Sequence, residues 1–176
     1  MRIAISGKSG CGNTTVSTLV ANELQYPLIN FTFRNLARER NMEFWEFCRL
    51  AEQDDAIDRE LDERQVAMAL AQDDCVLGSR LAIWVLKEAD LKVYLTASVE
   101  TRAQRIYLRE GGDPDKRLEE TVQRDKHDAA RYKRIYDIDN SDASIADMVI
   151  DTEHHNATEI AQMIVTKVRE MLTHKE

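Results

Sequence analysis

Several residue types that mark particular classes of protein are scarce in this chain of 176 residues. Its three cysteines, Cys11, Cys48 and Cys75, are odd in number, lie far apart and form no Cys-x-x-Cys pair. That pattern argues against a disulfide framework or a cysteine-based metal site and favours reduced thiols. No apolar run approaches the length of about 18 residues that a transmembrane helix needs, and repeats and low-complexity linkers are absent. We therefore expect a cytoplasmic protein that folds as a single domain over residues 1–176.

Basic residues are also in short supply. The chain has 24 lysine and arginine residues against 32 aspartate and glutamate residues, which gives a formal net charge of −8. Affinity for nucleic acids comes mainly from basic side chains on phosphates, so this balance argues against general nucleic-acid binding. Any anion site must be a local cationic patch. We expect a monomer whose partner is a small molecule, not a nucleic acid or a membrane.

The clearest positive signal is a glycine-rich segment, residues 7–15, between an apolar strand-like run and a helix-like stretch. The spacing of Gly7 and Gly12 matches the phosphate-binding P-loop, whose pattern is Gly-x4-Gly-Lys-Ser/Thr. Glycines let the backbone N–H groups approach an anion, and the following helix directs its positive end to the same place. The segment therefore predicts a nucleotide phosphate site formed by Gly7, Lys8, Ser9, Gly10, Cys11, Gly12, Asn13, Thr14 and Thr15.

One position of this loop departs from the pattern. Asn13 stands where the P-loop lysine normally neutralises the β- and γ-phosphates, and Lys8 is the other cation in the segment. We expect Lys8 to take over the role of the missing lysine. Thr14 retains the hydroxyl that binds Mg²⁺ in such loops. The alternatives are a loop that binds nucleotide without turnover and, less well supported, a strand–turn–helix junction that binds nothing.

The order of apolar and amphipathic segments predicts an α/β fold. Strand-like runs near residues 2–6, 28–30, 75–77, 92–96 and 148–151 alternate with helix-like segments. Such alternation is typical of a parallel sheet covered by helices on both faces, with ligands at the carboxyl ends of the strands. The expected helices span residues 14–25, 32–40, 43–52, 56–71, 80–87, 99–109, 114–135 and 157–173. Ser98 is expected to cap the sixth of these, and Asp113 followed by Pro114 to start the seventh.

Arginines at helical spacing form the second signal. Two sets flank the glycine pair at residues 111 and 112, and each set lies on one stripe of its helix. Closing arginines stabilise a transferring phosphoryl group and exclude water, so we expect a lid here. A solvated, salt-bridged surface is the alternative reading. The first set is Arg102, Arg105 and Arg109, and the second is Arg117, Arg124, Asp128 and Arg131.

Three further arginines are candidates for contacts with a nucleotide or its phosphate, and one acidic run is expected to be solvated. Arg80 follows a buried-looking strand, and an arginine at a strand end grips a phosphate or reaches a base edge. Arg34 and Arg38, on the helix after the second strand, are candidates for an acceptor phosphate. An exposed i,i+4 pair is an equally good reading of these two. An acidic run, which we expect to be solvated, includes Glu43, Glu46, Asp54, Asp55 and Asp58.

Taken together, these residues resemble the cytidylate kinases, in a short form without a large inserted domain. The P-loop alone is common to many kinases. The motif Arg124-Asp-x-x-Asp128-x-x-Arg131 and the Gly-x-Arg segment ending at Arg80 narrow the resemblance to this family. It extends over nearly the whole chain, through residues 7–15, 33–39, 58–62, 78–82, 89–97 with Arg102 and Arg105, and 124–132.

The resemblance implies a P-loop nucleoside monophosphate kinase fold with a five-stranded parallel sheet. It also implies transfer of the γ-phosphate of ATP to CMP or dCMP, with Mg²⁺ as cofactor. Residues 7–15 would hold the donor, helices within residues 31–72 would bind the acceptor nucleotide, and residues 109–117 would form the lid tip. The implied roles are catalysis by Lys8, Arg109, Arg124 and Arg131, with substrate contacts from Arg34, Arg38, Arg80, Arg124, Asp128 and Arg131.

The chain departs from the family at Asn13 and at Leu81, where many relatives carry an acidic residue after the strand-end arginine. These departures leave three other functions open. One is a nucleotide-binding protein of the same fold with little or no turnover. Another is a kinase for a different acceptor, such as shikimate or another nucleoside monophosphate. The third is an ATPase that is switched on by a partner.

Overall fold

The computed structural model describes residues 1–173, except the side chain of Trp45, so residues 174–176 of the expected domain lie outside the described residues. Strands and helices alternate as the sequence predicts. The fifth helix is shorter than expected and β2 has two residues. The elements are β1 (Arg2–Gly7), α1 (Asn13–Leu24), β2 (Leu28–Ile29), α2 (Phe33–Glu39), α3 (Phe44–Gln53), α4 (Asp55–Leu70), β3 (Cys75–Gly78), α5 (Ala82–Val85), β4 (Leu91–Thr96), α6 (Val99–Glu110), α7 (Pro114–Tyr136), β5 (Met148–Asp151) and α8 (Ala157–Thr173).

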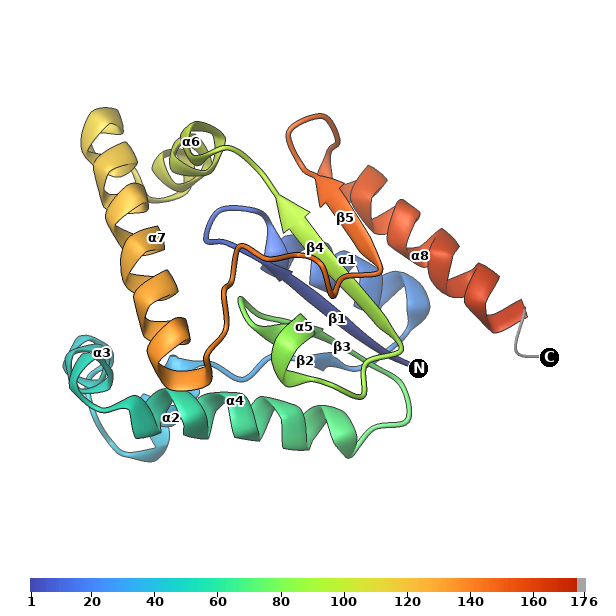
Figure 1. Ribbon diagram of the computed structural model, residues 1–176, viewed down its shortest axis with the longest axis horizontal. Helices are drawn as coiled ribbons and strands as arrows, with labels where there is room; N and C mark the ends of the chain where they lie inside the picture. The colour runs from blue at the N-terminus through green and yellow to red at the C-terminus, as the bar shows by residue number, and fades with distance from the viewer. Residues whose placement is uncertain (174–176) are drawn as a thin grey trace.

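The five strands form one parallel sheet in the order β2-β3-β1-β4-β5 (Figure 1). In the register, Ile3 of β1 lies opposite Val76 of β3 on one side and Leu91 of β4 on the other. The central strands are nearly continuous apolar runs because both faces of the sheet are covered. The chain therefore has the predicted fold.

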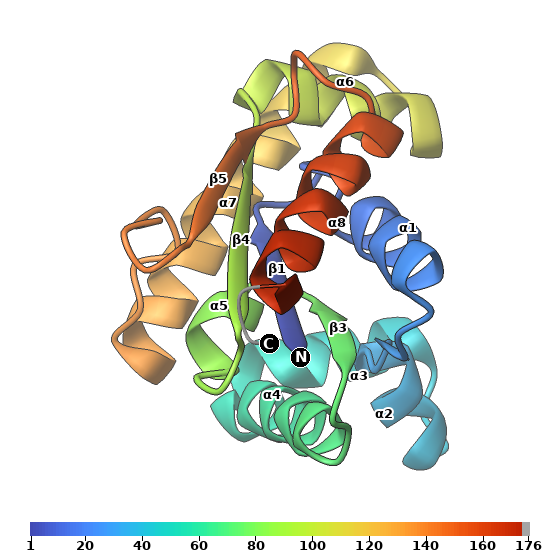
Figure 2. The ribbon, with the colours of Figure 1, turned by 90° about the vertical axis from the view of Figure 1, so that its right-hand side faces the viewer.

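Alternation along β1 divides its side chains between two cores. Ile3 and Ile5 pack with Val20 of α1 and Ile164 of α8 on one face of the sheet. Ala4 faces the other side, in a cluster that also contains residues of α4 and α5. Figure 2 shows α1 and α8 together on one side of the sheet and α5 on the other. The two layers leave the carboxyl edge of the sheet to the loops.

Helix α7 crosses this carboxyl edge, from α6 to the neighbourhood of α3 and α4 (Figure 1). It begins as predicted: the Asp113 side chain accepts a hydrogen bond from the Lys116 N–H, and Pro114 occupies the first helical turn. The N-cap of α6 is also confirmed, because the Ser98 side chain accepts from the Thr101 N–H. Within residues 1–173, every helix is too short or too polar to cross a membrane.

Candidate functional site

The loop between β1 and α1 has the backbone that its glycines predict. Gly10 and Gly12 have φ values of +86° and +98°, a region that side-chain-bearing residues rarely occupy. The Cys11 N–H donates to the Lys8 carbonyl oxygen at 3.0 Å and closes the turn. The loop leads directly into α1. Its N–H groups and the start of α1 thus lie together at the carboxyl end of β1, where an anion is favoured.

Asn13 does not take over the role of the P-loop lysine, because its side chain hydrogen-bonds within the loop. Its Nδ2 donates to the Gly7 carbonyl oxygen at 2.6 Å, and its Oδ1 is buried without a hydrogen-bond partner in the described structure. The side chain therefore braces the loop across its base. By contrast, Thr14 is exposed, and its hydroxyl makes no hydrogen bond within residues 1–173. That leaves the hydroxyl available for a ligand.

Lys8 is the cation of the loop. It is half-buried and forms no ion pair within residues 1–173. Hydrogen bonds from Ser141 lower the pKa of Asp139, and the charge of Lys8 adds a smaller lowering. Lys8 therefore lies toward the segment before β5 while remaining uncompensated by a close carboxylate.

The α6 arginines are not arranged as the predicted lid stripe. Arg102 is buried, with 3 % of its surface exposed, and its NH1 donates to the Ser9 carbonyl oxygen at 3.1 Å. Arg105 donates from NH1 to the Gly10 carbonyl oxygen at 3.3 Å and from NH2 to the Thr152 carbonyl oxygen at 2.7 Å. These two side chains support the loop from its outer side. For Arg102 and Arg105 the solvated-surface alternative is therefore wrong, and their contacts are with the loop and not with a free lid surface.

A second group of charges gathers where β3, α4 and α7 meet. The Asp128 carboxylate accepts from Arg80 NH1 at 2.9 Å and from Arg131 NH2 at 3.5 Å. Arg131 NH2 also lies 3.6 Å from Asp58 of α4. We call Arg80, Asp128, Arg131 and Asp58 the arginine–aspartate cluster. It brings together three of the predicted substrate-binding residues, from two segments far apart in the chain.

Asp58 is a functional candidate that the sequence reading missed. It was expected in a solvated acidic run, yet it is 4 % exposed and its Oδ2 has no hydrogen-bond partner in the described structure. Burial raises the pKa of this carboxyl, and the charge of Arg131 opposes the rise. The family resemblance includes residues 58–62 but assigns Asp58 no role, and no other local signal separates it from its acidic neighbours. Its partner is on α7, so only the packing of α4 against α7 identifies it.

Arg124 connects the cluster to the loop. Its NH1 lies 3.4 Å from the Ser9 hydroxyl oxygen. Desolvation lowers the pKa of Arg124, and the positive charge of Arg80 lowers it further. Two arginines thus stand within electrostatic reach of each other beside the loop. This is the local cationic patch that an acidic protein needs in order to bind an anion.

The remaining predicted residues lie outside these contacts. Arg34 stacks over the Phe44 ring at 3.9 Å from its centroid, and Arg38 is exposed in the last turn of α2. The side chain of Arg109 is 62 % exposed and pairs with Glu110 next to it. Arg109 and the glycines at 111 and 112, both with positive φ, lie at the turn between α6 and α7.

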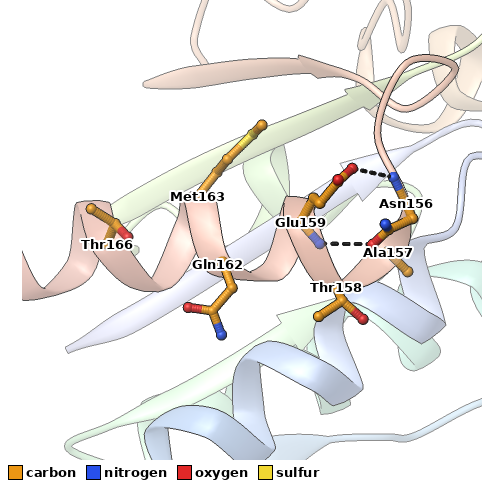
Figure 3. Close-up of a pocket in the computed structure, with 7 residues that line it drawn as sticks. All are labelled: Asn156, Ala157, Thr158, Glu159, Gln162, Met163 and Thr166. Carbon is orange, nitrogen blue, oxygen red and sulfur yellow. Dashed lines mark hydrogen bonds between the residues drawn. The ribbon is translucent and has the colours of Figure 1, made fainter.

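A separate open pocket runs along α8, and none of residues 7–15 lines it (Figure 3). Asn156 and Glu159 form a reciprocal cap at its end: each side chain accepts a hydrogen bond from the backbone N–H of the other residue. Its lining residues are neutral or acidic, so it offers no cation for a phosphate. They are Asn156, Ala157, Thr158, Glu159, Gln162, Met163 and Thr166.

Solved structures with low sequence identity share this fold. A shikimate kinase from Bacteroides thetaiotaomicron superposes with a TM-score of 0.60 and 17 % identity, covering 98 % of each chain. A deoxyadenosine kinase from M. mycoides superposes with a TM-score of 0.54 and 15 % identity, covering 96 % of this chain and 100 % of the other. The architecture is therefore that of the P-loop kinases.

Sequence relatives are much closer. A protein named cytidylate kinase 2 from Borreliella afzelii is 48 % identical over 168 residues, which are 93 % of this chain and 94 % of the relative. A cytidylate kinase from Methanocorpusculum labreanum is 40 % identical over 174 residues, 98 % of each chain. Residues 2–154 match the cytidylate kinase-like family. The chain belongs to the cytidylate kinase-like family.

Proposed function

We propose that this protein is a kinase that transfers the γ-phosphate of ATP to CMP or dCMP and releases ADP. The observation that carries the proposal is the arginine–aspartate cluster, which Arg124 joins to the glycine-rich loop. A protein that only binds a nucleotide needs the loop. A phosphotransferase also needs a second set of cations that holds the acceptor beside the donor phosphate. The names of the sequence relatives support the same reaction.

On the donor side, the proposal assigns the ATP phosphates to residues 7–15. Lys8 would neutralise the transferring phosphate in place of the P-loop lysine, because its charge is unpaired within the described chain. The Thr14 hydroxyl would hold Mg²⁺, and the bound ion would neutralise part of the phosphate charge. Asn13 keeps a structural part only, since its amide is committed to Gly7.

On the acceptor side, Arg80, Arg124, Asp128 and Arg131 would contact the nucleotide and its phosphate. Charge spreads over the equatorial oxygens during transfer, and fixed guanidinium groups stabilise it without reorganising. Arg34 and Arg38 would grip the acceptor phosphate from the segment 31–72. Arg109 would approach from the lid tip, residues 109–117, and help to exclude water. Alignment and charge neutralisation suffice for this chemistry, without a covalent intermediate.

The test is ADP production from ATP and Mg²⁺ with CMP, dCMP, UMP, AMP, shikimate or no acceptor. We expect turnover with CMP or dCMP. ATP consumption that is independent of the acceptor would favour an ATPase. Binding of ATP or CMP without ADP production would favour a nucleotide-binding protein that lacks turnover.

Lys8→Ala tests the assignment on the donor side. Loss of one preorganised charge of this kind typically lowers turnover by about 10²- to 10³-fold. The control is Lys167→Ala, at an exposed lysine of α8 that pairs with Glu170. If the Lys8 variant matched this control in turnover and in ATP affinity, another group would have to replace the P-loop lysine.

A further inference from the structure

All three nitrogens of the Arg102 guanidinium donate hydrogen bonds to other groups of the protein. It forms a two-pronged ion pair with Asp125 of α7, from NH1 to Oδ1 at 3.0 Å and from NH2 to Oδ2 at 2.6 Å. The same NH1 donates to the Ser9 carbonyl oxygen at 3.1 Å, and Nε donates to the Ala97 carbonyl oxygen at 3.3 Å. One side chain of α6 therefore joins the glycine-rich loop, the end of β4 and α7.

The loop is also pressed against the backbone of this residue. A Cβ atom added at Gly10 would lie 2.9 Å from both the carbonyl oxygen and the Cβ of Arg102. Ser9 is held at two points, at its carbonyl oxygen by Arg102 and at its hydroxyl by Arg124, the neighbour of Asp125. The loop and α7 thus share the same anchor.

The geometry of the Ser9–Gly10 peptide determines where the Gly10 N–H points. In a planar trans peptide, the carbonyl of one residue and the N–H of the next point in opposite directions. Because Arg102 fixes the Ser9 carbonyl, it directs the Gly10 N–H away from α6. That N–H donates no hydrogen bond within residues 1–173. It is therefore free to donate to a phosphate on the inner side of the loop.

Two aspartates of α7, Asp125 and Asp128, contact different halves of the site. Asp125 contacts the donor loop through Arg102, and one turn further along the helix Asp128 contacts Arg80 in the arginine–aspartate cluster. A displacement of α7 at Asp125 would therefore move Asp128 and Arg131 relative to the loop. A shift of about 1 Å at a distance from the reacting atoms is enough to cost about 10²-fold in rate.

We propose that Arg102 and Asp125 are positioning residues that fix the Ser9–Gly10 peptide for phosphate binding and set the acceptor helix α7 against the donor loop. The proposal rests on the proposed kinase function for its effect on turnover. Its effect on ATP binding does not depend on which acceptor is used. The Arg102 guanidinium and the Asp125 carboxylate are taken up by protein partners, so both residues would act through the loop and α7.

Stability alone is a poor explanation for this pair. Replacing a buried ion pair with apolar residues is often neutral or stabilising. The pair is better explained by the geometry that it enforces. Arg102→Lys is the informative variant, because lysine keeps the charge and the aliphatic stem but has no planar fork for the carbonyl and the carboxylate together.

The experiment compares Arg102→Lys, Arg102→Met and Asp125→Asn with the wild type by ATP titration calorimetry and steady-state kinetics. Arg2→Lys is the control, because Arg2 donates to the Ala69 and Gln72 carbonyl oxygens at the amino end of β1, the end opposite the loop. We expect the three variants to weaken ATP binding by about 10-fold or more and to lower turnover by about 10²-fold. The Arg2 control should lose thermal stability with little change in ATP affinity.

Two results separate this proposal from the proposed function. Unchanged ATP affinity and turnover in folded Arg102→Lys and Asp125→Asn would overturn the positioning role, even if the wild type is an efficient CMP kinase. Weakened ATP binding in a protein without acceptor-dependent turnover would support the pair and overturn the kinase assignment. If Arg102→Met does not fold, Arg102→Lys and Asp125→Asn still decide the question. A loss of ATP affinity of the same size in Arg2→Lys would reduce the Arg102–Asp125 pair to a contribution to stability.

Discussion

Asp128 carries the most specific prediction about the site, because a single carboxylate holds two arginines from different segments. Asp128→Asn keeps the shape of the side chain and removes its charge. Arg80 at 2.9 Å and Arg131 at 3.5 Å then lose their common counter-ion, and an amide group faces at least one guanidinium. The Asp128 side chain is 10 % exposed, so water compensates only partly for the loss.

The expected size follows from these distances. At an effective dielectric constant near 20, opposite charges about 3 Å apart attract by about 5 kcal/mol, most of which was offset by desolvation when the pair formed. Removing one partner of a fully buried pair costs about 3 to 5 kcal/mol, and partial exposure of Arg80 places this site near the lower end. We expect the free energy of unfolding to fall by about 2 to 3 kcal/mol.

Function should change on the acceptor side first. With Arg80 and Arg131 no longer held together, we expect the KM for CMP to rise by about 10-fold or more and the KM for ATP to change much less. The assays are urea unfolding and steady-state kinetics with each substrate varied. Asp55→Asn is the matched control, because Asp55 pairs with Arg134 across the same two helices at an exposed position. If both variants lost the same stability and kept the same KM for CMP, the cluster would not be an acceptor site.

Two further predictions concern other parts of the chain. Burial raises the pKa of Asp62 to about 6, against a smaller lowering by the hydrogen bond from the Tyr136 hydroxyl, so the folded state binds this proton more tightly than the unfolded state. The stability from this group is complete below about pH 4 and is lost as the pH rises to about 6. Asp62→Asn should therefore gain up to about 3 kcal/mol of unfolding free energy over the wild type between pH 4 and pH 7, and parallel pH profiles of the two proteins would refute the assignment. For the loop, Gly10→Ala should destabilise the protein more than Gly12→Ala in urea unfolding. Both glycines have positive φ, but only at Gly10 would the new Cβ press on the Arg102 backbone, and at Gly12 the nearest side-chain atom lies at 4.0 Å. Equal losses of unfolding free energy in the two variants would show that the loop can shift away from α6 at no cost.

The sequence alone determined the architecture and the location of the loop. Apolar runs, helix caps at Ser98 and Asp113, and the spacing from Gly7 to Gly12 are local signals, because each depends on residues within a few positions of one another. The strands, the main helices and the family followed from them. The sequence also indicated that Arg80, Asp128 and Arg131 belong to one site, through a motif that the family shares.

Only the tertiary structure decided which way the charged side chains face. Periodicity placed Arg102 and Arg105 on one stripe of a helix, but it could not say whether that stripe meets solvent or the loop 93 residues earlier in the chain. The same limit hid Asp58, whose burial depends on Arg131 of α7. Charged residues are buried only where a partner compensates for desolvation, and that partner comes from packing of distant elements. The positions of the charges were therefore readable from the sequence, whereas their partners were fixed by the fold.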